Sequence, residues 1–440
     1  MFGRYFLHLT TLCAILYSQT LFAQYPVLSP ILLQMQNLQD KSIKLSPFLK
    51  VIRNQSSQKN AESYSRLSDF LPKANLNLKK EKDFFETRNA PLRALGIGPA
   101  NSTWSIDYQW NLLNYGIIEA SRKTLTEKDK VLLELLSKEK EYPVTYKTNL
   151  LNYLLAKYKK AAVENSLKKA EAGKKEARLG FELGQKTKLD VLRSEANMVS
   201  LDSKKVSFAD EEQNAKCKFI EYSGLENSDL DFLENLEEDT VLEILNTLSF
   251  TVTSKSPPLF SKSPLLQSLK YDEEINNIAL SQLTQAEWPN LKLQGSYNNS
   301  GDSFSQTLHS PYRSHTIALV LTIPIFGGGS LIFSNFEQYF AKQQTKYSMA
   351  QKKLEIENNL SNSLIKINAL ETLVASLSLN VSQYEELYRL TNKSYQLGKS
   401  TLMELLEVQD KLLDSKINLA QNKIQFFTLS QNYLWQAGLQ

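Results

Sequence analysis

The sequence has little cysteine, histidine, glycine and proline, and each shortage narrows the class of protein. Among its 440 residues are 2 cysteines, 3 histidines, 15 glycines and 13 prolines. If a leader containing Cys13 is removed, Cys217 alone remains, which excludes a disulfide within the mature chain. His309 and His315 could be metal ligands. Because no cysteine lies near them, we favour two exposed loop residues and expect neither a metal nor a cofactor.

The sequence also lacks a dominant charge and, after its N-terminus, a long apolar run. Lysine and arginine number 51 and aspartate and glutamate 47, and both signs are spread along the chain. Nucleic-acid binding usually needs a concentrated basic face, so we expect no such partner. No later segment offers about 18 uninterrupted apolar residues, which argues against a membrane-spanning helix in the mature chain. Such a chain could enter a membrane only as β-strands.

Residues 1–23 are typical of a secretory signal peptide. Arg4 supplies the positive flank, and the apolar stretch from Phe6 to Tyr17 is too short to span a bilayer as a retained helix. Ala23 provides a small residue for cleavage before Gln24. The alternatives are an N-terminal anchor, which the short stretch disfavours, and a lipoprotein site at Cys13. That cysteine lies inside the apolar stretch and follows a leucine, whereas lipoprotein sites need a small residue.

The chain repeats one order of motifs in its two halves, at a nearly constant separation. This indicates an internal duplication. We predict a first repeat at 24–225, an equatorial linker at 226–262 and a second repeat at 263–440. In each repeat a serine caps a helix that begins with proline. The matched positions are Ser46-Pro47 and Ser263-Pro264, Pro72 and Pro289, Gly184 and Gly398, Leu192 and Leu406, and Gly224 and Gly438.

Two segments alternate polar and apolar residues with a period of two, which predicts β-hairpins at 73–112 and 290–326. Lys292, Gln294, Asp107 and Gln109 fall on the polar face. A half-buried sheet of a soluble protein would show the same alternation. Export and the placement of aromatic residues favour a membrane barrel instead. The aromatic residues expected at the membrane interface are Trp104, Tyr108, Trp110 and Tyr297.

A long helical stretch follows each hairpin, over about 117–183 and 331–397, with Pro143 as a possible kink in the first. At ~1.5 Å per residue, each helix would extend roughly 100 Å. Each ends at a glycine, and a threonine then caps a return helix with an acidic residue three positions later. The helix-capping residues are therefore Thr187 with Asp190, and Thr401 with Glu404.

This organisation resembles that of the TolC-like outer-membrane efflux proteins, over nearly the whole mature chain. The carrying motifs are Trp288-Pro289-Asn-Leu-Lys-Leu, Leu321-Thr-Ile-Pro-Ile-Phe-Gly-Gly-Gly329, Tyr395-Gln-Leu-Gly398 and Leu402-Met-Glu-Leu-Leu406. The resemblance implies a mainly α fold with a β-barrel part. Duplicated antiparallel coiled-coil helices would form an α-barrel tunnel, and four strands per subunit would contribute to a trimeric twelve-stranded transmembrane β-barrel. Four strands alone cannot close a barrel, so oligomerisation is required on physical grounds as well.

The resemblance further implies an outer-membrane homotrimer with a large periplasmic part. Its partners would be a periplasmic adaptor (membrane fusion) protein, an inner-membrane transporter and outer-membrane lipid. The adaptor-docking tips would be Leu183-Gly184-Gln185 and Leu397-Gly398. The gate residues would be Glu404, Glu407, Tyr395 and Asp190. The family also has a gate arginine; its position holds Ser400 in this sequence, and Lys399 lies beside it and is a further candidate gate residue. Capping alone would also explain Asp190 and Glu404, and the role of Glu407 rests on the resemblance.

We therefore expect a passive channel subunit of a tripartite efflux or type I secretion system, and no enzyme. Gly327-Gly328-Gly329 lacks the lysine and serine or threonine that follow in a phosphate-binding loop, so a strand-to-helix bend explains it. The alternative is a non-transporting outer-membrane protein, such as an adhesin or a structural spacer. Only the channel would need an aqueous lumen and a tip that opens.

Overall fold

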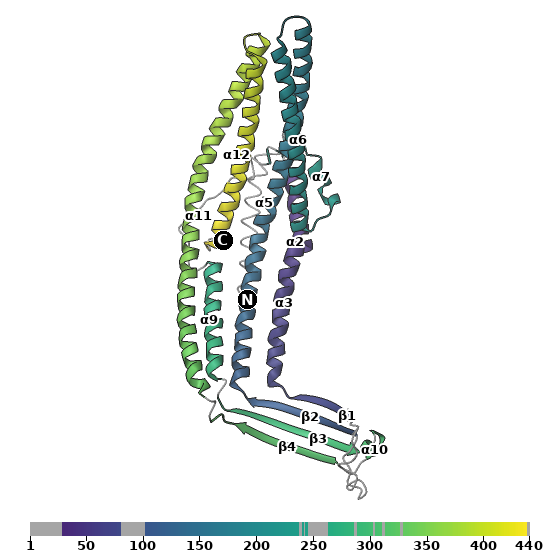
Figure 1. Ribbon diagram of the computed structural model, residues 1–440, viewed down its shortest axis with the longest axis vertical. Coiled ribbons are helices and arrows are strands. Elements are labelled where there is room, and N and C mark those ends of the chain that lie inside the picture. The colour runs from purple at the N-terminus through teal and green to yellow at the C-terminus, as the bar shows by residue number, and fades with distance from the viewer. Residues whose placement is uncertain are drawn as a thin grey trace. The chain divides into compact units, whose positions relative to one another are not determined.

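The computed structural model describes residues 29–80, 102–236, 240–241, 243–244, 263–285, 288–301, 304–309, 313–325 and 329–437. The predicted signal peptide, most of the predicted linker and two glycines of the triple-glycine bend lie outside these ranges. In the described part, long helices are joined to a single sheet of four strands (Figure 1). The predicted fold class is therefore confirmed at the level of one subunit.

Four antiparallel strands form the sheet in the order β1-β2-β3-β4. The strands are β1 (Lys73–Lys80), β2 (Ser102–Leu113), β3 (Asn290–Gly301) and β4 (Arg313–Thr322). β1 and β2 come from the first predicted hairpin and β3 and β4 from the second, and the two hairpins pair through β2 and β3. A short helix, α10 (Phe304–His309), interrupts the connection between β3 and β4.

The strand register sorts the side chains onto two chemically different faces, because successive residues of a strand point to opposite sides. One row across β2, β3 and β4 joins Tyr108, Gly295 and Ile317. The adjacent row, on the opposite face, joins Asp107, Ser296 and Thr316. Gly295 is required here, since a Cβ atom would overlap the ring of Tyr108. The apolar face carries Ala74, Leu76, Leu78, Trp104, Ile106, Tyr108, Trp110, Leu293, Tyr297, Ile317, Leu319 and Leu321.

In its described residues, the first repeat has two long helices before the sheet and two after it. α2 (Ser29–Leu45) and α3 (Pro47–Leu67) lead to the short helix η1 (Ser68–Phe70), and α5 (Tyr115–Glu182) and α6 (Lys188–Ser223) follow β2. α5 is 68 residues long and continues through Pro143. Part of the linker forms η3 (Asn227–Leu230) and α7 (Asp231–Glu234).

Among its described residues, the second repeat has the same order, with a single helix before its strands. α9 (Pro264–Gln285) precedes β3, and α11 (Ser330–Gln396) and α12 (Leu402–Gln436) follow β4. α11 and α12 run side by side (Figure 1) and share a core of Leu360, Ile367, Val374, Phe426 and Tyr433. The helix and strand positions thus repeat between the halves, and the exact repeat boundaries stay a prediction.

The predicted serine caps at the starts of α3 and α9 are wrong. The Ser46 amide donates to Ser42 O at 2.8 Å and its carbonyl accepts from Lys50 N at 3.1 Å, so helical hydrogen bonding continues from α2 into α3. The Ser46 hydroxyl instead donates to Tyr222 O at 2.8 Å. The hydroxyl of Ser263 is buried and makes no hydrogen bond. Proline does begin both helices, as its fixed φ allows.

Backbone contacts divide the chain into two compact units, and each takes segments from both repeats. One unit comprises residues 1–53, 135–266 and 355–440, and the other residues 54–134 and 267–354. The sheet with the adjoining helical segments belongs to the second unit. The duplication visible in the sequence is therefore not a division into two separately folded halves.

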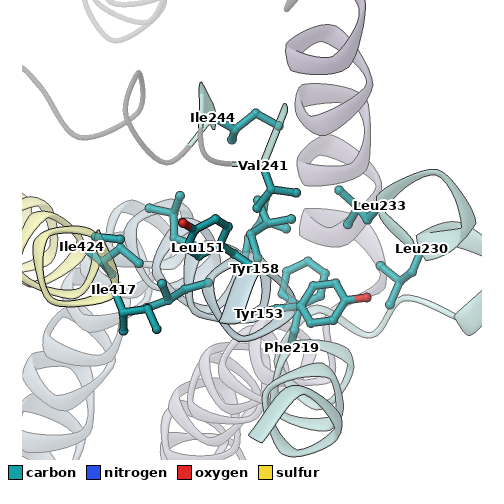
Figure 2. Packing of buried hydrophobic residues seen from close by; sticks show 14 of the residues in the cluster. Leu151, Tyr153, Tyr158, Phe219, Leu230, Leu233, Val241, Ile244, Ile417 and Ile424 are labelled. Atoms are coloured by element: carbon teal, nitrogen blue, oxygen red, sulfur yellow. The ribbon is translucent and has the colours of Figure 1, made fainter. Parts of the chain in front are cut away.

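The core of the first unit is built around the middle of α5. Leu151, Tyr153 and Tyr158 lie between Ile417 and Ile424 of α12 on one side and Phe219 of α6 on another (Figure 2). Leu230 and Leu233, from the linker, are fully buried against the same cluster. Burial of such side chains contributes ~1.5–3 kcal/mol each, which fixes the helices of this unit against one another.

One described helix, α11, is long and apolar enough over part of its length to cross a membrane, on those two criteria alone. The sequence analysis excluded such a helix because it counted uninterrupted apolar residues, and Lys366 and Glu371 interrupt this one. When hydropathy is averaged over 18 residues instead, this stretch of α11 passes the test of length and composition. Only 11% of the stretch is buried, which leaves Ile365, Leu373 and Leu379 exposed. A helix of 67 residues with polar faces is better explained by packing against other helices.

Candidate functional site

The first tip, residues 179–190, is a tight turn between α5 and α6. The Gln185 and Lys186 amides donate to Gly180 O at 2.7 and 3.0 Å, and Gly184 has φ of 70°. A positive φ favours glycine, because other residues incur a Cβ clash. Leu183 beside it is 71% exposed. The turn therefore presents an apolar side chain to solvent on a rigid backbone.

The second tip, residues 393–404, repeats this geometry between α11 and α12. The Gly398 amide donates to Tyr395 O at 2.9 Å, the Lys399 amide donates to Ser394 O at 2.8 Å, and Gly398 has φ of 72°. Leu397 is 63% exposed. The glycine stop was visible in the sequence of both tips because it depends on neighbouring residues only.

A capping box follows each glycine. The Thr187 hydroxyl accepts from the Asp190 amide at 3.2 Å, and the Asp190 carboxylate accepts from the Thr187 amide at 3.0 Å. Thr401 and Glu404 make the same reciprocal pair at 3.3 and 3.1 Å. The Thr187 hydroxyl also donates to Asp190, and these bonds hold the pKa of Asp190 below its ordinary value. Both acids thus have a structural function at the start of a return helix.

A cluster of three side chains, Glu176, Lys186 and Tyr395, connects the two tips within one subunit. Tyr395 Oη donates to Glu176 Oε1 at 2.6 Å, and Lys186 Nζ donates to the same oxygen at 2.8 Å. Lys186 Nζ also lies 5.8 Å from the centre of the Tyr395 ring. Glu176 comes from α5, Lys186 from the first tip and Tyr395 from the end of α11. The sequence pointed to Tyr395 but to neither of its partners.

The charges of this cluster stabilise one another. The bonds from Lys186 and Tyr395 hold the pKa of Glu176 below its ordinary value. Although partial burial opposes it, the bond to Glu176 raises the pKa of Lys186. Partial burial and the neighbouring carboxylate raise the pKa of Tyr395. All three therefore stay in the protonation states that form the link over the neutral pH range.

The remaining predicted gate residues lie at the second tip and along α12. Glu407 Oε1 accepts from Lys411 Nζ at 2.6 Å on the same helix, which holds the pKa of Glu407 below its ordinary value. Lys399 is exposed in the turn. The structure brings Tyr395 to Glu176 and Lys186, whereas the sequence analysis had grouped Tyr395 with Asp190 and Lys399.

The predicted interfacial aromatics occupy one face of the sheet. Trp104 and Tyr297 have ring centres 5.4 Å apart, and Tyr108 Oη lies 3.0 Å from His315 Nε2. Trp110 Nε1 donates to Phe70 O at 2.7 Å. The side chain of His309 is outside the described residues. Within the described ranges, no group of three or more His, Cys, Asp or Glu side chains is arranged to hold a metal.

Comparison with known proteins matches residues 261–432 to the family described as "Outer membrane efflux protein". This match covers 172 of the 440 residues of the chain. Alkaline protease secretion protein AprF of Pseudomonas aeruginosa is 21% identical over 261 residues. That match spans 59% of this chain and 53% of AprF, so the chain covers about half the length of this curated relative.

Solved structures of outer membrane channels have the same fold. The Campylobacter jejuni CmeC outer membrane channel superposes with a TM-score of 0.74 at 14% identity, over 92% of this chain and 85% of that one. The Vibrio cholerae outer membrane protein VceC gives a TM-score of 0.67 at 13% identity, over 92% of this chain and 96% of that one. The predicted resemblance to TolC-like outer-membrane efflux proteins is thus confirmed, and the family is one of outer-membrane channel proteins rather than enzymes.

Proposed function

We propose that the chain is the outer-membrane channel subunit of a tripartite efflux or type I secretion system. The observation that carries this proposal is the sheet, which has one apolar and one polar face and two edge strands, β1 and β4. Open strand edges are not tolerated in the hydrocarbon of a bilayer. Pairing β4 of one subunit with β1 of the next removes both edges, and three subunits then supply twelve strands to one barrel.

The polar face becomes the lining of an aqueous lumen in this assembly. Lys292, Gln294, Asp107 and Gln109 lie on that face, while the predicted interfacial aromatics lie on the other. The chain conducts its cargo passively and performs no catalysis. The exposed leucines of the two tips dock a periplasmic adaptor, through which an inner-membrane transporter supplies the cargo.

We further propose that Glu176, Lys186 and Tyr395 hold the tip of each subunit closed. The link joins the α5–α6 and α11–α12 hairpins of one subunit, so separating the hairpins requires breaking it. This cluster would hold the tip closed without the arginine whose position is occupied by Ser400.

A cysteine scan along β4 tests the barrel. After replacement of the exposed Cys217 by serine, single cysteines at Ile317, Ala318, Leu319, Val320 and Leu321 are labelled in intact outer membranes with a charged thiol reagent. Ala318 and Val320 face water and should react, whereas the other three face lipid and should be protected, because successive residues alternate between faces.

Uniform labelling along the strand would overturn the barrel assignment, as would recovery of a monomer without detergent. Planar-bilayer recordings separate the channel from the alternative of a non-transporting outer-membrane protein. A trimer that inserts with this labelling pattern but never conducts would support the alternative.

Replacing Glu404 and Glu407 by alanine tests the predicted gate acids. Three subunits would place six carboxylates around one opening, and a ring of acids favours cations over anions. The double variant should therefore lose cation selectivity and block by polyvalent cations in planar bilayers, while trimers remain intact. Because Glu404 also caps α12, Thr401→Ala is the control, since it removes the cap bond without removing charge. Unchanged selectivity in the double variant would reduce both acids to helix-stabilising residues.

A further inference from the structure

We propose that the apolar face of the sheet binds a phosphate-bearing lipid headgroup at the end nearest the hairpin loops. This inference rests on the proposed function, because it requires that the apolar face contact lipid. The site, called the headgroup site below, consists of Arg313 and His315 on β4, Tyr297 on β3, and Trp104 and Tyr108 on β2.

The composition of the apolar face changes along the strands. Toward the helices, β4 contributes Ile317, Leu319 and Leu321 to this face, which are between 57% and 63% exposed. Toward the loops, the same face of β4 continues with His315 and Arg313, both exposed. Arg313 is paired with Asn299 and His315 with Tyr297. A leucine-rich band therefore gives way to basic and polar residues within two rows.

The position of this change suits the boundary of a membrane. Arg313 and Leu321 are eight residues apart, or about 27 Å along a strand at ~3.4 Å per residue. An outer-membrane barrel has an apolar band about 25 Å tall with aromatic residues at both edges, and strand tilt shortens the projection onto the barrel axis. The headgroup site thus lies near the edge of the band, where lipid phosphates are found, and not at its centre.

The charged residues that the four strands place on this face are all basic. The sole acidic residue of the four strands is Asp107, which lies on the opposite, polar face, where its carboxylate accepts from Asn77 and Ser105. Lys80 belongs to the same face as Arg313, at the loop end of β1. A face with lysine, arginine and histidine but no acid in its strands complements an anion and would repel a cationic headgroup.

The aromatic residues position the imidazole. Tyr108 Oη lies 3.0 Å from His315 Nε2, and the centre of the Tyr297 ring lies 6.1 Å from that of His315. Trp104 continues the cluster, with its ring centre 5.4 Å from that of Tyr297. Tyrosine and tryptophan favour the membrane interface because each has an apolar body and a polar group. The cluster therefore offers an apolar support for acyl-chain carbons beside a guanidinium cation and an imidazole that can donate to a phosphate.

Native mass spectrometry of the purified trimer tests the proposal, with phosphatidylglycerol and phosphatidylcholine of matched acyl chains as probes. The wild type should retain phosphatidylglycerol preferentially. The double variant Arg313→Gln, His315→Gln should retain it about tenfold less, because it loses charge-assisted hydrogen bonds. Lys79→Gln is the matched control, since it removes a cation near the same end of the sheet but on the polar face. Inorganic phosphate should not displace the lipid at equal concentration.

The other possible results of this experiment would each contradict a stated part of the proposal. Equal losses in the control and the double variant would show unspecific attraction and overturn the site, as would a wild type without lipid preference. Displacement by inorganic phosphate would overturn a lipid as the occupant. The same spectra report trimers, and planar bilayers report conductance. Trimers that conduct without lipid preference refute this inference alone, whereas a protein that forms no membrane trimer refutes the proposed function and this inference together.

Discussion

Replacing Glu176 by glutamine together with Tyr395 by phenylalanine should raise the conductance of the isolated channel. The two changes remove both bonds to the Glu176 carboxylate within each subunit. After allowance for solvent screening, each subunit loses ~0.5–1 kcal/mol of the link, or about 1.5–3 kcal/mol per trimer. The ratio of open to closed tips should then rise about 10- to 150-fold, measured as open probability in planar bilayers.

Glu386→Gln is the matched control for this prediction. Glu386 pairs with Arg389 three residues later on α11, so its replacement breaks an ion pair near the second tip without separating two helices. Its recordings should match the wild type. Equal effects of the control and the double variant would show that general loss of charge, and not the link between hairpins, alters the tip.

The pH dependence of the link has a defined sign. The pKa of Glu176 in the folded chain lies below its ordinary 4.5, so its contribution is complete above that pH and is lost as the pH falls through the lowered pKa. The raised pKa of Lys186 keeps its contribution complete below 10.5. The wild-type open probability should therefore be constant between about pH 5 and 9 and rise in stronger acid.

Leu319→Arg should prevent assembly in the outer membrane. Leu319 lies in the apolar band of β4 and is 63% exposed in the subunit. An arginine on the lipid face near the middle of a barrel costs ~2–4 kcal/mol, and three subunits would incur about 6–12 kcal/mol together. Heat-stable trimers in the outer-membrane fraction, detected by gel electrophoresis, should be lost or strongly reduced.

Ala318→Arg provides the control in the adjacent residue. Ala318 is paired with Gln294 on the polar face, where an arginine would face water in the proposed lumen. This variant should assemble normally, with altered ion selectivity only. If Ala318→Arg alone fails to assemble, the assignment of the two faces is reversed. If both variants assemble equally well, the sheet does not face lipid.

The strands and tips could be predicted because their signals are local. Period-two alternation fixes which face each strand residue occupies, and Gly184 with Thr187 and Asp190 encodes a helix stop and restart within seven residues. The helix α10 could not be found, since six residues within a hairpin connection show no helical period. The serine cap at Ser46 was wrong because α2, which the sequence analysis did not predict, continues into α3.

The link between the tips could not be predicted from local patterns. Tyr395 and Glu176 are 219 residues apart and belong to different repeats, so only the packing of the two hairpins brings them together. The duplicated sequence suggests that each tip is held closed by its own set of equivalent residues. In the structure, the three residues are not equivalent positions of the repeat, and the two tips contribute different residues to one cluster.

The pairing of β2 with β3 also constrains biosynthesis. Ser102 is paired with Gly301, so the central ladder of the sheet joins segments 199 residues apart, which the ribosome synthesises at different times. Until β3 arrives, β1 and β2 form an isolated hairpin, which is marginally stable in water, with apolar residues on one side. Under the proposed function, the first half is therefore an aggregation-prone intermediate, and a holding chaperone should bind it until residues 290–301 arrive.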